Sequence, residues 1–354
     1  MLMNEDNYEG TASIIEDDRT LPNAVIFFKT PNKENKFKFR TTSIKFIHPT
    51  KDTFHDNWSD IKSEFGPEIE VSQYADIEAE WSREFLSFSW VAQKETTGSG
   101  RLIRSKADSP SELPAQIMRW PEFKEHISNH VQPRKQIFRG QNKPWRLRSS
   151  FHRSGRADLF RYVWQDIPSL HRRVMYRTKH LFNLEIPDQN GAFYNLVQHH
   201  GYPTPLLDWT YSPYVAAFFA YRGISNSEAE CAKPEDMVRI HIFEQAQWVE
   251  TFAPLPPKAL SVHLNISVVE FMAIDNDRLL PQQGASMITN VDDVESFIQQ
   301  RQPKGKVFLR AIDLPVQDRR QAMLELSYMG ITAASLFPGL DGACEELAER
   351  NFDI

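Results

Sequence analysis

The segment from Gln198 to Tyr221, QHHGYPTPLLDWTYSPYVAAFFAY, constrains this chain most, because it mixes polar side chains with residues that must be buried. Within it, Leu206–Trp209 is predicted to be a strand. A helix is predicted from Pro213, because proline is favoured in the first turn of a helix. Buried polar groups are destabilising unless each finds a partner, so the segment predicts a site or a tightly bonded core. Six of its polar residues have the chemistry of a site: His199, His200, Thr204, Asp208, Thr210 and Ser212.

A second constraint is Ile137–Gln141, an apolar, strand-like stretch that holds an arginine and ends in Gly-Gln. Arg139 offers a planar fork of donors that can grip a diphosphate or a carboxylate through two hydrogen bonds. Gly140 has no side chain and lets a ligand approach the backbone. The two segments together predict one site built from separated strands. The alternative is that Arg139 is buried and braces the fold by pairing with Asp208.

The length of 354 residues predicts two domains. Short segments of alternating apolar and polar residues fill the first third of the chain, with a hairpin turn expected at 96–100. We therefore expect an α+β protein, with a small antiparallel β domain over residues 1–107 and an α+β domain over residues 108–354. In the second domain, 159–182 is predicted to be helical and 331–336 to be a strand.

Several function classes are not expected from the composition. No stretch approaches the roughly 18 apolar residues that a membrane helix needs, so no membrane partner is expected. Cys231 and Cys344 are the two cysteines, and their spacing fits neither a disulfide framework nor a metal site. The cytoplasm is the simplest compartment for such a chain. No bound metal is expected, because His199 and His200 are adjacent and have no third ligand at helical spacing.

The net charge of −6 conceals a basic tract. Between Arg134 and His180, 13 Lys and Arg stand against two acidic residues, so the tract is +11 and the remainder −17. Aromatic residues alternate with the basic ones. Concentrated positive charge favours a polyanionic or phosphate-bearing partner such as nucleic acid. The alternative is a solvated face that pairs with the acidic remainder of the protein.

Four blocks of the second domain form an ordered set of motifs. The blocks are Phe138–Gln141 with Trp145, Gln198–Thr210 with the following helix, Arg278 with Gln282 and Gly284, and Leu336–Gly342. Together they resemble the FRG-domain family of bacterial proteins, named for a Phe/Tyr-Arg-Gly motif, and the resemblance covers residues 115–345. The chain departs from the family at Pro205, where arginine is usual, and at Ala285-Ser286, where an aromatic residue is usual.

A more distant resemblance is to ADP-ribosyltransferase folds, which place an arginine on an early strand and a polar strand ahead of a Ser-x-x-x-Ala-x-x-Phe helix. A later strand in those folds carries a glutamate, where this chain has Gln282 or Gln283. The resemblance implies NAD as the cofactor, with Arg139 on the diphosphate. The other implied contacts to the nucleotide are Gly140, Gln141, Thr204, Trp209, Thr210, Ser212, Gln282 and Gln283.

Proton transfer would fall to His199 or His200, since histidine titrates near neutral pH. A histidine at a helix end also serves as a C-terminal cap. Asp208, between Leu207 and Trp209, is expected to be buried and to orient a histidine or to bond Arg139. Ser212 serves equally well as the N-cap ahead of Pro213. Trp209 is either a stacking platform or a core residue.

Three functions follow from these residues. The first is an ADP-ribosyltransferase-like or NAD-cleaving enzyme in bacterial toxin action or antiphage defence, which would act on a protein or nucleic-acid acceptor. The second is a nucleic-acid-binding or nuclease module that uses the basic tract. The third is a noncatalytic nucleotide sensor. In each case the domain at residues 1–107 is expected to support the second domain or to bind a protein partner.

Overall fold

The computed structural model describes residues 2–3, 6–16, 18, 20–41, 43–51, 53–252 and 263–352. By internal contacts this part of the chain separates into two compact units. The first contains the described parts of 1–106, 155–170 and 259–265, and the second those of 107–154, 171–258 and 266–354.

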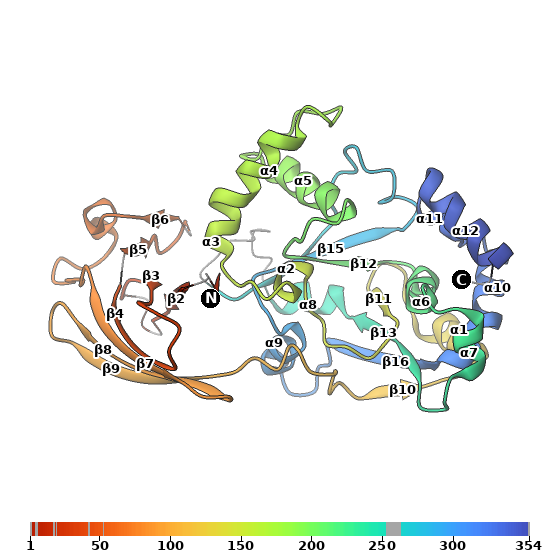
Figure 1. The fold of residues 1–354 in the computed structure, drawn as a ribbon, viewed down its shortest axis with the longest axis horizontal. Helices are drawn as coiled ribbons and strands as arrows, with labels where there is room; N and C mark the ends of the chain where they lie inside the picture. The colour runs from red at the N-terminus through yellow and green to blue at the C-terminus, as the bar shows by residue number, and fades with distance from the viewer. Residues whose placement is uncertain are drawn as a thin grey trace. The chain divides into compact units, whose positions relative to one another are not determined.

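The first unit is built from two antiparallel sheets, drawn in red to orange in Figure 1. The five-stranded sheet has the order β1 (Leu2–Met3), β2 (Tyr8–Ile14), β3 (Ala24–Lys29), β5 (Ser43–Ile47) and β6 (Phe54–His55). The four-stranded sheet has the order β4 (Lys36–Arg40), β7 (Ala75–Trp81), β8 (Phe85–Ala92) and β9 (Thr97–Ile103). Two 3-10 turns, Trp58–Asp60 and Lys62–Glu64, follow β6.

The hairpin turn predicted at 96–100 is wrong, since these residues largely belong to β9 and the turn lies at 93–96. The two glycines that suggested a turn serve cross-strand packing instead. Gly98 lies opposite Trp90, and Gly100 lies opposite Phe88. A Cβ atom would come within 2.2 Å of the Trp90 ring at Gly98 and within 2.7 Å of the Phe88 ring at Gly100.

The helix predicted over 159–182 is correct only in its first part. The chain forms α3 (Leu159–Arg161), a π-helical turn (Tyr162–Asp166) and α4 (Ile167–Val174), and helical structure stops there. Beyond Val174, the hydroxyl of Thr178 donates to the carbonyls of Met175 and His180. The Asp275 carboxylate accepts the backbone N–H groups of Lys179 and His180. These bonds satisfy the backbone in a loop and replace further helical turns.

The second unit is organised around a seven-stranded sheet in which only β10 and β16 pair in parallel. The strand order is β10 (Ala115–Ile117), β16 (Leu309–Pro315), β13 (Met237–Phe243), β11 (Ile137–Gln141), β12 (Leu206–Thr210), β15 (Gly284–Thr289) and β14 (Ile266–Val269). Helices with antiparallel sheets confirm the α+β class.

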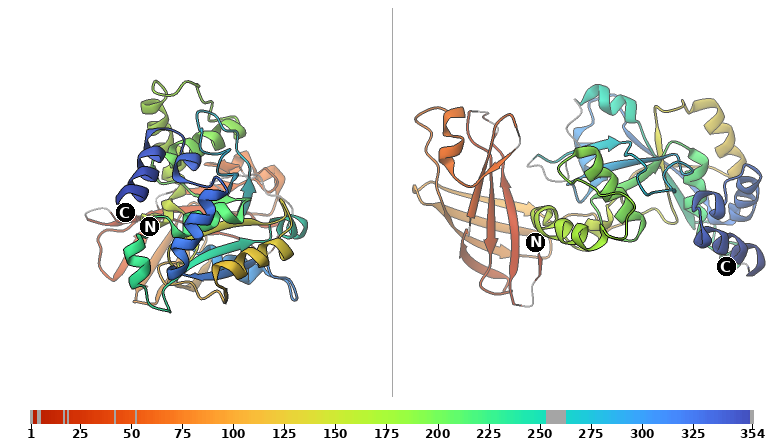
Figure 2. Two further views of the ribbon diagram at one scale, coloured as in Figure 1. Left: turned by 90° about the vertical axis from the view of Figure 1, so that its right-hand side faces the viewer. Right: turned by 90° about the horizontal axis from the view of Figure 1, so that it is seen from above.

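Helices cover both faces of this sheet (Figures 1 and 2). The first face packs against α1 (Trp120–His130), α6 (Pro213–Tyr221), α7 (Asn226–Cys231), α10 (Arg319–Tyr328) and α11 (Ala333–Leu336). The second face packs against α8 (Gln245–Thr251) and α9 (Val294–Arg301). The remaining helices are α2 (Ser150–Arg153), α5 (Pro187–His199) and α12 (Leu340–Phe352).

The strand predicted at 331–336 is wrong, because Ala333–Leu336 forms the short helix α11. Its start is fixed by a capping box. The Thr332 hydroxyl accepts the backbone N–H of Ser335, and the Ser335 hydroxyl accepts the backbone N–H of Thr332. This local capping signal outweighs the β-branched residues that suggested a strand.

A close helix–sheet contact lies at Gly140, where α6 packs against β11. A Cβ atom there would lie 1.8 Å from the carbonyl oxygen of Ala216 and 2.7 Å from the backbone nitrogen of Ala220. Gly140 therefore lets the α6 backbone approach the strand, with the small residues Ala216, Ala217 and Ala220 fully buried beside it. The α6 backbone occupies the space that the missing side chain leaves, and the approach of a ligand to Gly140 stays a prediction.

We predict that Gly140→Ala destabilises the second unit strongly, because the clash is with backbone atoms that cannot rotate away. The free energy of unfolding should fall by about 3 kcal/mol, as for severe overpacking. Gly305→Ala is the control, because Gly305 has a positive φ of 85° and open space around it. The free energy of unfolding of Gly305→Ala should fall by only about 1 kcal/mol. Equal losses in urea unfolding would show that the contact at Gly140 is not tight.

Candidate anion-binding site

The second unit contains a cavity of about 760 Å³ at the end of β11. Its lining comes from β11, the loop that follows, and helices α2, α6, α10 and α12 or residues just beyond them. The side chains that dominate it are basic: Arg139, Arg146, Arg153, Arg222 and Arg319. Concentrated guanidinium groups in a concave site favour an anionic ligand.

Two of these arginines are neutralised by α12. Nε and Nη2 of Arg222 donate to the two carboxylate oxygens of Glu345, at 2.5 and 2.7 Å. Nη2 of Arg319 donates to Glu349 at 2.6 Å. Both carboxylates also line the cavity.

Arg139 and Arg153 differ from the others, because neither forms an ion pair with any residue that the structure describes. Nη1 of Arg139 donates to the backbone carbonyl of Asp208 at 2.6 Å, and its buried Nε has no partner among the described residues. Burial lowers the pKa of Arg139 to about 10 and also lowers that of Arg153. Both stay protonated at neutral pH, so the cavity holds two positive charges that no carboxylate compensates directly.

Arg153 is positioned by the short helix α2. The Ser149 hydroxyl caps this helix by accepting the backbone N–H of His152, and it lies 2.7 Å from Nδ1 of the same residue. The Ser150 hydroxyl donates to the carbonyl of Thr204 and accepts its N–H. Thr204 is fully buried. The structure thus gives Thr204 a role in holding α2, and through α2 the cavity.

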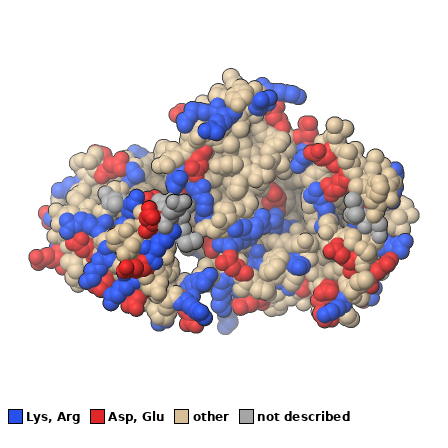
Figure 3. All heavy atoms as spheres, in the orientation of Figure 1, with Lys and Arg blue, Asp and Glu red and all other residues tan. Residues whose placement is uncertain are grey.

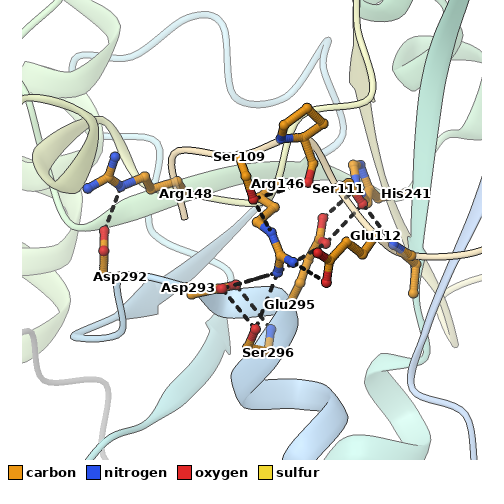
Figure 4. Close-up of polar contacts among 12 residues, drawn as sticks. Ser109, Ser111, Glu112, Arg146, Arg148, His241, Asp292, Asp293, Glu295 and Ser296 are labelled. Atoms are coloured by element: carbon orange, nitrogen blue, oxygen red, sulfur yellow. Dashed lines mark hydrogen bonds and ion pairs between the residues drawn. The ribbon is translucent and has the colours of Figure 1, made fainter. Parts of the chain in front are cut away.

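A network of hydrogen bonds and ion pairs holds the buried guanidinium group of Arg146 in place (Figure 4). Its Nε donates to the Ser109 hydroxyl, and its Nη1 contacts Asp293, the N-cap residue of α9, at 3.1 Å. Its Nη2 lies 2.9 Å from Glu112. Only 2% of the Arg146 side chain is exposed, so these partners are needed to offset the loss of hydration.

The same network reaches the sheet beneath Arg139. His241 on β13 pairs across the ladder with Arg139, so both side chains lie on the second face of the sheet. Nε2 of His241 lies 3.4 Å from the carboxylate of Glu295, and both side chains are fully buried. Ser111 joins Glu295 to Arg239, which forms a two-point ion pair with Asp313.

The predicted residues Gln141, Gly140 and Arg139 line the cavity together, whereas the others lie outside its lining. The expectation that Asp208 is buried is wrong, because its side chain is exposed. Its neighbours on β12 alternate, so Leu207 and Trp209 point into the core while Asp208 points out. Gln198 bridges this carboxylate to the Thr204 hydroxyl.

The two histidines have different environments. His199 is half-buried, and its Nδ1 lies 2.6 Å from Nδ2 of Asn276. Burial lowers the pKa of His199, so the ring is neutral at pH 7. His200 is exposed and is the C-cap residue of α5, the alternative role expected for a helix-end histidine.

The other polar residues of this run bond within the fold. The Ser212 hydroxyl caps α6 by accepting the N–H of Val215. The Thr210 hydroxyl donates to the carbonyl of Gln282, and the Gln282 side chain donates to the carbonyl of Leu336. Trp209 is a core residue of the second face, and Gln283 adopts a positive φ of 47°. No ligand role is needed to explain these contacts.

Sequence reasoning missed the arginines that come from separated elements, namely Arg153, Arg222 and Arg319. Arg222 directly follows the α6 segment, so its position after the apolar run was a usable signal. Arg319 begins α10, far along the chain, and nothing in the sequence connects it to Arg139. Trp145 belongs to the first motif block and to the aromatic residues of the basic tract, and in the structure it lines the cavity and is 47% exposed.

Part of the basic tract pairs with acidic residues of the protein, and another part is exposed and available to an anionic partner. Arg148 pairs with Asp292, and Arg156 pairs with Asp158 and Asp166. A second group is exposed and forms no ion pair with any described residue: Arg172, Arg173, Arg177 and Lys179. Figure 3 shows basic side chains at the top of the view, where α4 and the loop after it lie in Figure 1.

Residues 134–229 match the family model of the FRG domain. This segment is an FRG domain. It contains β11 with Arg139, α2 with Arg153, the β12–α6 run and Arg222. Searches of curated proteins and of solved structures returned no match.

Among the helices of the described residues, none has the length and apolar character needed to cross a membrane. Within the same described ranges, no three His, Cys, Asp or Glu side chains are grouped so as to hold a metal ion.

Buried histidines near the cavity predict a pH-dependent stability. Burial lowers the pKa of His152 from 6.5 to about 4, and it also lowers the pKa of His241. Below pH 6.5 the unfolded chain binds protons that the folded chain does not, so the free energy of unfolding should fall as pH falls toward 4. The midpoint of urea unfolding measured from pH 7 to 4.5 tests this. His152→Asn should flatten the dependence, and an unchanged slope in that variant would contradict a neutral buried His152.

Proposed function

We propose that the FRG domain binds a phosphate-bearing nucleotide in the arginine cavity, with NAD as the first candidate. The observation that carries this proposal is the pair of guanidinium groups, Arg139 and Arg153, that line the cavity without an ion-pair partner among the described residues. Uncompensated charge in a partly buried site is destabilising, and an anionic ligand would remove that penalty.

The shape and chemistry of the cavity support a nucleotide over a simple anion. Its volume of about 760 Å³ is within the range of small-molecule sites. Trp145 lines it and is 47% exposed, so its ring is available for stacking on a base. Planar guanidinium groups match the paired oxygens of a phosphate. Gln141, beside Arg139, adds an amide for a ribose or phosphate contact.

For the reaction we propose cleavage of the nicotinamide–ribose bond of NAD: nicotinamide leaves, and the ribose carbon bonds to water or, as in ADP-ribosyltransferases, to a nucleophile of an acceptor. This cleavage needs mainly positioning and stabilisation of positive charge on the ribose. Asp208 is the candidate for that role, because its carboxylate is exposed and its backbone carbonyl lies 2.6 Å from Nη1 of Arg139, which places it next to the cavity although outside the lining. A toxin or antiphage role is the biological setting that we propose for such an activity.

We predict that Arg139→Ala and Arg153→Ala each weaken NAD binding by at least tenfold, since a charged hydrogen bond contributes about 1.5–3 kcal/mol. Isothermal titration with product analysis of the same samples measures binding and nicotinamide release together. Arg172→Ala is the control, because it removes the same charge at an exposed position outside the cavity. Asp208→Asn should retain binding and lose nicotinamide release.

The outcomes separate the candidate functions. Binding that depends on Arg139 but yields no product would favour a nucleotide sensor over an enzyme. No binding at millimolar NAD or ADP, or equal binding by wild type and both arginine variants, would overturn the proposal. Arg139 would then be a brace that holds β12 through the carbonyl of Asp208.

A second candidate function, nucleic-acid binding, is favoured by the exposed group Arg172, Arg173, Arg177 and Lys179 with Tyr176, which is 72% exposed. Basic residues beside an exposed aromatic ring fit a single-stranded nucleic acid. The triple variant of Arg172, Arg173 and Arg177 to Glu should abolish RNA binding that weakens steeply with salt. Wild-type binding that is absent or insensitive to salt would exclude this function.

A further inference from the structure

Two carboxylates of the protein itself line the arginine cavity and pair with its arginines. Glu345 and Glu349 lie one turn apart on α12, so both project from the same face of the helix. Glu345 meets Arg222 with two oxygens, and Glu349 meets Arg319. A carboxylate that accepts two hydrogen bonds from a guanidinium has the same contact geometry as two oxygens of a phosphate.

Apart from these ion pairs, few polar contacts hold α12: Glu346 accepts the backbone N–H of Ala334 at 3.2 Å, and the exposed Asp341 lies 3.7 Å from Arg278. Of its 13 residues Gly342 alone is buried, where a Cβ would lie 2.1 Å from the carbonyl of Phe337. Its large apolar side chains Leu340, Leu347 and Phe352 are exposed. Little apolar area therefore holds this helix, so its polar contacts, the two carboxylates facing the cavity among them, contribute to its attachment.

Resting on the proposed function, we infer that Arg222 and Arg319 form a second anion subsite of the same cavity, occupied in this structure by Glu345 and Glu349. Arg139 and Arg153 form the first subsite. The ligand that fits both carries at least two anionic groups, such as the diphosphate of a dinucleotide. Such a ligand competes with α12 for the second pair of arginines, so its binding displaces the two carboxylates.

The test is titration with ADP of wild type and of the isosteric variant Glu345→Gln/Glu349→Gln. Loss of two competing, partly exposed ion pairs should tighten ADP binding by about tenfold. Orthophosphate has one anionic group and should gain less than ADP. The variant Glu230→Gln/Glu270→Gln is the matched control, because it removes the same charge from exposed pairs that lie outside both α12 and the cavity lining.

A second measurement does not depend on the variant folding. Hydrogen exchange of α12 in the wild-type protein should become faster when ADP is added, because the ligand takes the arginines that hold the helix. Unchanged or slower exchange in α12, with ADP bound, would overturn the second subsite.

The outcomes distinguish this inference from the function on which it rests. Equal ADP affinity in wild type and Glu345→Gln/Glu349→Gln would overturn the second subsite while leaving the Arg139 site intact. The same gain in the control variant would assign the effect to net charge and would also overturn it. If neither protein binds ADP or NAD, the proposed function fails, and the second subsite fails with it.

Discussion

The close contact between α6 and β11 at Gly140 is the constraint on which the rest of the second unit depends. The absent side chain lets the carbonyl of Ala216 lie where a Cβ atom would otherwise be, so helix and strand run in backbone contact. This contact buries the apolar side of α6 against the first face of the sheet. It also brings the end of α6, with Arg222, to the end of β11, where Arg139 and Gln141 lie. The cavity therefore follows from a packing requirement.

The arginines of the cavity differ in whether the fold supplies them with an ion-pair partner. The chain supplies carboxylates or hydrogen-bond acceptors to Arg146, Arg222 and Arg319, and it leaves Arg139 and Arg153 with none of the described carboxylates in contact. The difference follows the elements that carry these residues. Arg146 is paired with carboxylates at the N-terminus of α9 and in the 109–112 segment. Arg139 instead lies on a central strand, where the residues beside it on the adjacent strands are His241 and Trp209. The guanidinium groups of Arg139 and Arg153 are therefore available to an anionic ligand.

Local signals in the sequence predicted much of the fold. The strand–turn–helix run with Ser212 before Pro213 folds as expected, because capping and proline preferences act over a few residues. The turn predicted at 96–100 was wrong because its glycines make room for aromatic side chains on the neighbouring strand. The helix predicted to continue over 174–182 was wrong because hydrogen bonds of a loop end it. The strand predicted at 331–336 was wrong because a capping box starts a helix there despite the β-branched residues. Arg139 was identifiable from its motif. The sequence did not show that Arg153, Arg222 and Arg319 converge on it, because that convergence depends on tertiary packing between elements that are distant in sequence.

The most direct test of this account is a crystal structure of the protein soaked with ADP at saturating concentration. We predict density for the ligand in the arginine cavity, with phosphate oxygens in hydrogen-bonding distance of Arg139 and Arg153 and the base against Trp145. An empty cavity under those conditions, or ADP bound elsewhere with Arg139 still directed only at the carbonyl of Asp208, would contradict the central claim that the cavity is an anion-binding site.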